Sequence, residues 1–547
     1  MTYPAAPFAP RYGRGGMVNA ADQLAALAGL RMLDQGGSAG DAAVAAAAVM
    51  AVTSPHMCGM GGDVLAMIAE PGRPPVALLS TGHAGSGVDA AALRARGHRV
   101  MPLRGDPHSV PVPGAVDGWL AIHDRFGRLP LHRVLEPAVA LAEDGFEASL
   151  LLAMASHLIH QVPGAQELCP DGPLRPTQRV RLPGVARALR AVGLEGRGGF
   201  YGGEFGMELL DVGDGVFSLA DLARSTVQWC EPVRLSVWGH DLWTVPPPSQ
   251  GYLTLASAWI AERAGLGTDP TDPLWAHLVV EASRAAGHDR PDVLWEDADG
   301  QALVAEDRLG AAAERLRHDR AAAPDVAPDG GAGSGSGAGT PRLGDGDTTH
   351  LCAIDSDGLG VSLTQSNALD FGSHIVAGST GIFLHDRGVG FSLQEGHPAE
   401  LGPGRRPPHT LSPMLTTTGD GSLSHLIGAM GGDAQPQILL QLLARMLRAG
   451  QDPATAVTAA RVALDAPSAG PFRLWWGPDL EVMAEAHAPE SWTAGLRERG
   501  HRVRMIGAFD PTAVGCAQII AVEEEGPRLY VGAADPRSPD GATVVRS

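Results

Sequence analysis

The stretch DTTHLCAIDSDGLGVSLTQSN (347–367) contains two strand-like runs around a short polar turn. Residues 350–354 and 360–365 are largely apolar or β-branched, and residues 355–358 (DSDG) are of the kind that close tight turns. We therefore expect a buried β-hairpin. The preceding segment, residues 321–347, consists mostly of Ala, Gly, Ser, Pro and Asp, so it cannot form a core and is expected to be a flexible linker or tail.

The residue at this junction, Thr348, suggests a specific chemistry. On composition alone, an ordinary linker before an ordinary strand is the commoner arrangement. A Thr that begins a chain, however, can attack with its hydroxyl while its own α-amino group, with a pKa of about 7.7 to 8.0, acts as base. Cleavage after Asp347 would create this terminus: the Thr348 hydroxyl attacks the Asp347 carbonyl, an N-to-O acyl shift gives an ester, and water releases it.

The composition argues against several classes of protein. The chain has 547 residues, 44% of them hydrophobic, which suffices for roughly two to four globular units. Its formal charge of −20, from 61 acidic and 41 basic residues, disfavours nucleic acid and anionic membranes as partners. The sequence contains no lysine, which excludes lysine Schiff-base chemistry and a P-loop lysine. We expect a small-molecule substrate.

Neither a targeting segment nor a metal site is evident. Residues 1–16 lack a continuous apolar segment, so we expect a cytoplasmic protein. The longest apolar run, residues 42–52, is shorter than the roughly 20 residues that cross a bilayer. The five cysteines form no CxxC pair, and His56 and Cys58 lack further ligands at a usual spacing. We expect no disulfide framework, no metal and no cofactor.

Helical and strand-like patterns are mixed along the chain. Apolar spacing predicts helices at 20–33 and 41–52, and the second is so rich in Ala that it must be tightly packed. A glycine-dense turn at 55–63 leads into a strand at 64–70. Further expected elements are two strands within 231–251 and a helix at 252–264. This order predicts an α+β fold.

Six longer motifs are spread over nearly the whole chain. They are GGSAGDAAVAAAAVMAVTSPHMCGMGGD (36–63), VPGAVDGW (112–119), LPLHRVLEPAVALAEDGF (129–146), PPPSQG (246–251), GSTGIFL (378–384) and ADPRSPDG (534–541). In this order, together with DTTHLCAIDSDG (347–358), the sequence resembles the gamma-glutamyltranspeptidase family of N-terminal-nucleophile (Ntn) hydrolases. Each motif alone is a weak indication of this family, but their combination in this order is a specific one.

The resemblance implies a fold and a maturation route. It implies a four-layer αββα sandwich and an autocatalytically cleaved zymogen, a hydrolase or acyltransferase that works as a heterodimer. Residues 1–347 would form the large subunit and residues 348–547 the small one. Thr348 would be the nucleophile. Assembly into a higher homo-oligomer stays open.

The resemblance also implies roles for residues near Thr348. Ser366 matches a family Thr whose hydroxyl bonds to the nucleophile. Gly431 and Gly432 match a Gly-Gly pair whose backbone N–H groups form the oxyanion hole. Without the resemblance, Ser366 would read as a strand-end serine and the glycine pair as a turn into a helix.

The sequence departs from the family where glutamate would bind. The family's Arg position falls at Thr81, its serine pair at His409 and Thr410, and its acidic residue at Gly390. We expect an uncharged pocket without a bidentate carboxylate contact, so that glutathione would be a poor substrate. The candidate substrate-binding residues are Thr81, His83, Asn367, Gly390, His409 and Thr410. Arg405 and Arg406 are read as surface or supporting residues.

Three functions stay open. The leading one is an Ntn hydrolase of the divergent gamma-glutamyltransferase-like branch, which transfers an acyl group from Thr348 to water or an amine. An alternative is a C–C bond hydrolase, or an amide or β-lactam acylase, of actinobacterial secondary metabolism. The Arg-only, Ala- and Gly-rich composition fits a GC-rich genome. A third is an unprocessed, non-catalytic binding protein.

Overall fold

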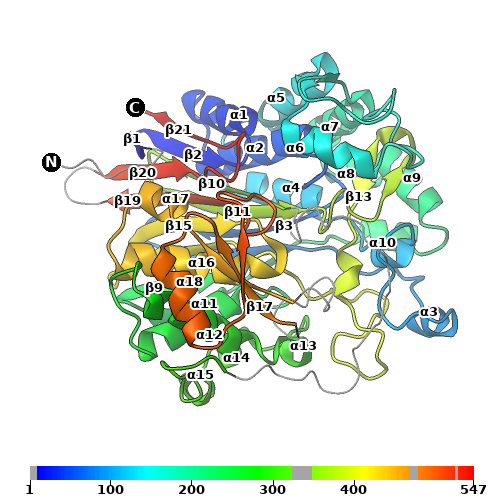
Figure 1. Cartoon of the computed structure of the whole chain (residues 1–547). Helices are drawn as coiled ribbons and strands as arrows, with labels where there is room; N and C mark the ends of the chain where they lie inside the picture. Colours follow the sequence, from blue (N-terminus) through cyan, green and yellow to red (C-terminus); the bar gives the residue numbers. More distant parts are fainter. Residues whose placement is uncertain (1–8, 323–347, 467–478, 524–527) are drawn as a thin grey trace.

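The computed structural model describes residues 9–322, 348–466, 479–523 and 528–547 (Figure 1). The predicted hairpin is confirmed as β10 (Thr349–Asp355) and β11 (Gly360–Ser366), which pair antiparallel and are buried throughout. The Asp355 carboxylate accepts hydrogen bonds from the backbone N–H groups of the turn that joins them. The predicted linker lies, except for residues 321–322, outside the described residues.

The hairpin lies in the middle of the first of two seven-stranded antiparallel sheets. Its strand order is β21-β2-β10-β11-β3-β4-β7. The remaining strands are β21 (Ala542–Arg546), β2 (Gly16–Ala20), β3 (Asp63–Ala69), β4 (Val76–Ser80) and β7 (Gln228–Cys230). The hairpin is therefore flanked directly by β2 and β3 from the first 70 residues, and the C-terminal strand β21 pairs with the outer side of β2.

The second sheet faces the first. Its order is β1-β20-β19-β15-β14-β9-β8. The strands are β1 (Arg11–Gly13), β20 (Leu529–Ala534), β19 (Ala517–Glu523), β15 (Leu423–Ala429), β14 (Met414–Thr417), β9 (His240–Thr244) and β8 (Val233–Val237). Apolar side chains of both sheets, among them Leu65, Ile354 and Leu426, form the layer between them.

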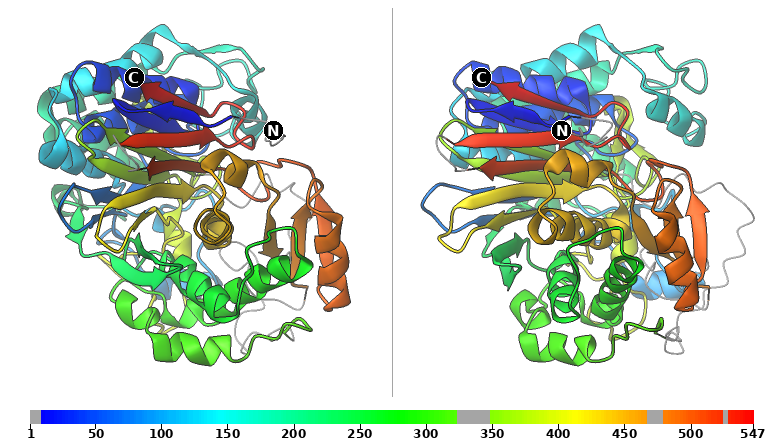
Figure 2. Two further views of the ribbon diagram at one scale, coloured as in Figure 1. Left: turned by 90° about the vertical axis from the view of Figure 1, so that its left-hand side faces the viewer. Right: turned by 60° about the vertical axis from the view of Figure 1, so that its left-hand side comes forward.

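Helices cover both outer faces. On the first sheet lie α1 (Gln23–Asp34), α2 (Ala39–Thr53) and α4 (Ala115–Phe126), and α5 (Leu131–Asp144) packs on α2. On the side of the second lie α11 (Tyr252–Arg263), α12 (Pro273–Gly287), α16 (Gln435–Leu443) and α17 (Pro453–Thr458). Figures 1 and 2 show the layer order helix, sheet, sheet, helix. The predicted α+β, four-layer αββα architecture is confirmed.

The Ala-rich helix is packed as its composition predicts. Every residue of α2 is buried, and small side chains let α1, α5 and β10 approach it closely. Ser38 and Asp41 cap its start reciprocally. The helix predicted at 20–33 instead begins at Gln23, because residues up to Ala20 belong to β2 and Asp22 caps the helix.

Shorter elements complete the fold. They are α3 (Ala90–Ala95), α6 (Leu150–Ala155), α7 (Pro183–Glu195), α8 (Arg197–Tyr201), α9 (Glu204–Val212), α10 (Leu219–Ala223), α13 (Arg290–Val293), α14 (Gly300–Leu303), α15 (Glu306–Ala313), β5 (Phe146–Glu147), β6 (Arg179–Val180), β12 (Ile375–Ala377) and β13 (Ile382–Leu384). None of the helices in the described ranges is long and apolar enough to cross a membrane.

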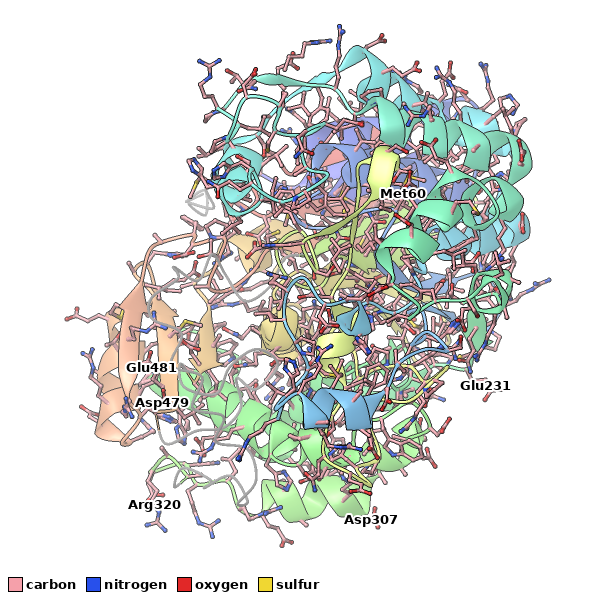
Figure 3. All side chains as sticks on the ribbon, turned by 90° about the vertical axis from the view of Figure 1, so that its right-hand side faces the viewer. Met60, Glu231, Asp307, Arg320, Asp479 and Glu481 are labelled. Atoms are coloured by element: carbon pink, nitrogen blue, oxygen red, sulfur yellow. The ribbon has the colours of Figure 1, made fainter. Side chains whose placement is uncertain are left out.

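A small third sheet stands at one side of the molecule. It consists of β16 (Val462–Asp465), β17 (Glu481–Glu485) and β18 (Val503–Ile506), with α18 (Glu490–Glu498) beside it. Figure 3 shows Glu481 on this sheet, far from Met60, which lies in the glycine-dense turn after α2.

Candidate active site between the two sheets

The candidate nucleophile lies at the first position of the hairpin. Thr348 immediately precedes β10 and is only 1% exposed. Its Oγ1 is 3.0 Å from Ser366 Oγ, at the end of the paired strand. Ser366 Oγ also accepts a hydrogen bond from the Ala368 N–H at 2.8 Å, and either hydroxyl of the Thr348–Ser366 pair can be the donor. The structure thus joins the two predicted hydroxyls directly.

The same row of the sheet continues beyond Ser366. Ser366 pairs with Asp63 on β3, and Thr81 follows directly after β4, the next strand. Paired residues project from the same face, here the one toward the second sheet, at about 4.8 Å per strand. Thr81 is buried, and its hydroxyl donates to the Gly82 carbonyl. This row therefore contains three hydroxyls, from Thr348, Ser366 and Thr81, and one carboxylate, from Asp63.

Asp63 is the centre of a fully buried polar cluster. Its Oδ2 accepts from His409 Nε2 at 2.8 Å and from Arg387 Nε at 2.9 Å, and His385 Nδ1 lies at 3.3 Å. Arg387 Nη1 donates to Thr410 Oγ1 at 3.0 Å. We call these five residues the Asp63 cluster. Its interactions bring both predicted residues, His409 and Thr410, onto one buried ion pair.

The protonation states of this cluster follow from its surroundings. Burial alone would raise the pKa of Asp63, but Arg387 and His409 outweigh it and hold that pKa well below its ordinary value. Burial, followed by the charge of Arg387, lowers the pKa of His409 to about 4. Since His409 Nδ1 accepts from the Leu411 N–H, neutral His409 donates through Nε2 to the Asp63 carboxylate.

Sequence reasoning missed Asp63 and Arg387. It expected an uncharged pocket, whereas His409 and Thr410 contact a buried carboxylate and a buried guanidinium. Both charges stand in or beside quoted motifs, since Asp63 ends the glycine-dense turn and Arg387 closely follows GSTGIFL. Charged residues in or beside such motifs could have been recognised as candidates for a buried ion pair, because buried charges require partners. Which charge meets which residue depends on the tertiary structure.

The glycine pair lies at the same end of the sandwich as Thr348. β15 packs on β10 and β11: Ser362 donates to the Ile427 carbonyl, and the His350 ring lies against Gly428. Ser362 pairs with Cys352, so the His350–Gly428 contact lies closer to the start of β10 than the Ser362–Ile427 contact does. The end of β15 therefore points toward the start of β10. Gly431 and Gly432, just beyond that end, therefore continue toward Thr348.

Three anchors hold the glycine loop. Gly431 and Gly432 have φ values of 138° and 50°, which other residues rarely adopt. Gln250, from the PPPSQG motif, donates Nε2 to the carbonyls of Gly432 and Thr410, both at 3.0 Å. Asp433 forms a buried ion pair with Arg290 at 2.8 Å. On the other side, Met430 N–H donates to the Cys516 carbonyl. The loop conformation is thereby fixed from several elements.

A buried ionic network supports this loop from behind. Arg461 donates to the Gly515 carbonyl at 2.9 Å and to Asp535 at 2.5 Å, and Gly515 packs directly on the Met430 carbonyl. Arg537 bridges Asp535 and Glu485. Asp535 and Arg537 belong to the ADPRSPDG motif, so this motif has a structural role next to the glycine loop.

The other predicted residues flank the row. Asn367 braces the glycine-dense turn through hydrogen bonds with Pro55 and Met57, and its Oδ1 has no partner among the described residues. His83 is buried, and neither ring nitrogen has a described partner. Burial and nearby Arg224 lower the pKa of His83 to about 4. Asp347 lies outside the described residues.

Gly390 lies on the same short helical turn as Arg387 (Arg387–Gly390). A Cβ at this position would lie 2.5 Å from the Pro408 carbonyl oxygen, so the two loops touch here. Arg405 and Arg406 are held by Glu296, through the Arg405 side chain and the Arg406 backbone. These contacts agree with the interpretation of Arg405 and Arg406 as supporting residues.

Comparisons with known proteins agree with this geometry. The family described as Gamma-glutamyltranspeptidase matches residues 25–545. The oxamate amidohydrolase proenzyme of Klebsiella pneumoniae subsp. pneumoniae is 34% identical, with 96% of this chain and 97% of that protein covered. The acylase ACY 1 proenzyme of Pseudomonas sp. (strain V22) is 30% identical over 98% and 95%. The cephalosporin acylase structure from Bacillus halodurans superposes with a TM-score of 0.87 at 28% identity, covering 100% and 98%. With this fold, and with a family match over almost its whole length, the chain belongs to the gamma-glutamyltranspeptidase family of Ntn hydrolases.

Proposed function

We propose that this chain is a proenzyme that cuts itself between Asp347 and Thr348 and then hydrolyses amides through an acyl-enzyme on Thr348. The observation that carries the proposal is the 3.0 Å pairing of the Thr348 and Ser366 hydroxyls at the start of β10. A hydroxyl held in this way can attack, and cleavage would give it an adjacent amine as base. The proenzyme names of the relatives support the same route.

Self-cleavage follows from the chemistry of Thr348. Its Oγ attacks the Asp347 carbonyl carbon, the C–N bond breaks, and the nitrogen takes up the proton as an α-amine. The resulting ester is hydrolysed by water, which leaves a carboxylate on Asp347 and the hydroxyl on Thr348. Ser366 holds the attacking oxygen through its hydrogen bond.

Amide hydrolysis repeats the attack on a substrate. The α-amine of Thr348 takes the hydroxyl proton while Oγ attacks the amide carbonyl, and the departing nitrogen leaves with a proton. Water then attacks the ester, and the acid product departs. The N–H groups of Gly431 and Gly432 would stabilise the oxyanion in both steps, an interaction for which removal of one donor costs about 100- to 1,000-fold in rate in other enzymes.

The sheet topology would keep the two products of self-cleavage together. In the first sheet, β2, β3, β4 and β7 would come from the large subunit (1–347), and β10, β11 and β21 from the small one (348–547). β2 lies between β21 and β10, and β11 pairs with β3. Each fragment would need the other to complete its sheets, which supports a stable heterodimer.

Asp63 argues against gamma-glutamyl substrates. A glutamyl group must bring its α-carboxylate into the pocket, but the buried guanidinium of Arg387 is already paired with Asp63, one strand from Ser366, and is not available to bind that carboxylate. We propose instead an amide without that group. Primary amides of small acids, or N-acyl amides, are the classes suggested by the names oxamate amidohydrolase and cephalosporin acylase.

Intact-mass measurement and N-terminal sequencing test the proposal. The wild-type protein should give two fragments, one of which begins Thr-Thr-His-Leu, and Thr348→Ala should stay in one piece. Assays with oxamate, a glutaryl amide and gamma-glutamyl-p-nitroanilide should show turnover of at least one of the first two. A full-length wild-type chain that is active would refute the nucleophile, and dominant gamma-glutamyl activity would refute the substrate class.

A further inference from the structure

A pocket of about 140 Å³ lies beside the Asp63 cluster. One part of its wall is apolar and is formed by Leu294, Val389, Gly390, Phe391, Ala399 and Pro408, while Arg290, Ser392 and His397 add polar groups. Leu294, Phe391 and Ala399 are buried, so the wall is part of the packed structure. We call it the Phe391 pocket.

The Phe391 pocket adjoins all three segments of the candidate site. Gly390 shares its short helical turn with Arg387, which bonds to Asp63. Pro408 directly precedes His409, which bonds to the same carboxylate. Arg290 also lines the pocket, and its partner Asp433 directly follows the Gly431–Gly432 pair. A group in this pocket would therefore lie against the loops that carry Arg387 and His409 and, through Arg290, next to Asp433.

The charged side chain in the lining already has a counter-charge, which favours an uncharged occupant. Arg290 lines the pocket, and its charge is compensated by buried Asp433 at 2.8 Å. The other polar lining residues are Ser392 and His397, and His397 Nδ1 accepts a hydrogen bond from the Ala399 N–H. A carboxylate or an ammonium placed here would lose hydration without gaining a free counter-charge. The volume is also informative, because it is close to the roughly 150 Å³ of an engineered cavity that binds benzene, so a ring fits by size.

We propose that the Phe391 pocket holds an uncharged, ring-sized substituent of the substrate's acyl group. The inference rests on the proposed function, because the acyl group is the part that is transferred to Thr348. When a primary amide is hydrolysed, the leaving group is ammonia, which is about the size of a water molecule. The acyl group is then the part of the substrate large enough to fill the pocket.

Ammonia release from two primary amides tests the inference: phenylacetamide, which carries a ring, and oxamate, which does not. Ala399→Leu adds three carbon atoms to the pocket wall, and Ala399→Ser is the matched control of nearly unchanged size. We expect Ala399→Leu to lower kcat/KM for phenylacetamide at least 10-fold, mainly through KM, and to change oxamate turnover less than about 3-fold. Ala399→Ser should leave both within about 3-fold.

Several outcomes would overturn the inference without touching the proposed function. They are self-cleavage with oxamate turnover but none of phenylacetamide, or equal effects of Ala399→Leu on both amides. Absence of self-cleavage would refute the proposed function instead. In that case phenylacetamide binding, measured by ligand-observed NMR on wild-type and Ala399→Leu protein, decides the pocket separately: binding lost in the variant supports it, and equal or absent binding refutes it. Thermal melting of both variants verifies that they fold.

Discussion

The imidazole ring of His350 lies directly against the backbone of Gly428, so closely that a Cβ at residue 428 would overlap the ring. His350 stands two residues after Thr348, and Gly428 stands three residues before Gly431. This contact therefore couples the strand of the candidate nucleophile to the strand of the candidate oxyanion loop. His350 is held in place by Thr364 and Cys352, so the ring has little room to move.

Gly428→Ala should therefore both destabilise the protein and slow self-cleavage. Overpacking in a buried core costs about 1 to 3 kcal/mol, and separating β15 from β10 would displace the glycine loop. Thermal denaturation and the time course of cleavage on gels measure the two effects. Gly419→Ala is the control, because a Cβ there meets nothing within 4 Å. Equal behaviour of the two variants would contradict the coupling.

The hydroxyl group of residue 366 should affect the rates of self-cleavage and turnover more than the size of its side chain does. Ser366→Ala removes the group bonded to Thr348 Oγ1. Because this oxygen would gain negative charge as it attacks, and hydrogen bonds to charged groups contribute about 1.5 to 3 kcal/mol, we expect self-cleavage and turnover to fall roughly 10- to 100-fold. Ser366→Thr keeps the hydroxyl and should retain most of the rate. Quantified gels and initial rates are the measurements. If the Thr variant were as slow as the Ala variant, the hydrogen bond would not be the cause.

Asp63 and Arg387 should be strongly coupled. Asp63→Asn leaves Arg387 buried without its counter-charge, which should lower the free energy of unfolding by about 3 to 5 kcal/mol. Arg387→Gln should have a similar effect. Urea denaturation of both single variants and the double variant should show that the double variant loses about 1 to 3 kcal/mol less than the sum.

An exposed ion pair serves as the control for this comparison of single and double variants. Arg179 and Glu147 form an ion pair whose side chains are 54% and 62% exposed, so Arg179→Gln and Glu147→Gln should each change stability by less than about 1 kcal/mol. Additive losses at Asp63 and Arg387, as at this surface pair, would mean that the buried pair is not formed.

Buried neutral histidines should make the protein sensitive to mild acid. Burial lowers the pKa of His350 to about 3, and burial with Arg387 lowers that of His409 to about 4, against about 6.5 in an unfolded chain. Below pH 6.5 the unfolded chain binds protons that the folded chain does not. The free energy of unfolding should thus fall as pH falls from about 6.5 toward the folded pKa values, by up to about 1.4 kcal/mol per pH unit for each group.

Urea denaturation between pH 7.5 and 5 measures this slope. His350→Asn should reduce the slope by about one group's contribution, whatever it does to the stability at pH 7.5. His318→Asn, at an exposed position, should leave the slope unchanged. A slope that is the same in all three proteins would show that His350 is protonated in the folded state.

Much of the fold was predictable because local patterns and global packing agree. The hairpin at 350–365, the Ala-rich helix and the two strands within 231–251 all appear where sequence spacing places them. The helix predicted at 20–33 began three residues late, because β2 pairs with β10 through residues that also fit a helical pattern. Pairing between distant strands decided that boundary.

By itself, the sequence determined the class of fold, the family and the candidate nucleophile, because turn chemistry, helix spacing and ordered motifs are local properties of the chain. The tertiary structure alone decided that Asp63 meets Arg387, His385 and His409, that His350 rests on Gly428, and that the Phe391 pocket borders the Asp63 cluster. These relationships join residues that are up to 346 positions apart. Buried charges and close backbone contacts depend on which strands become neighbours, and that depends on how the two sheets pack together.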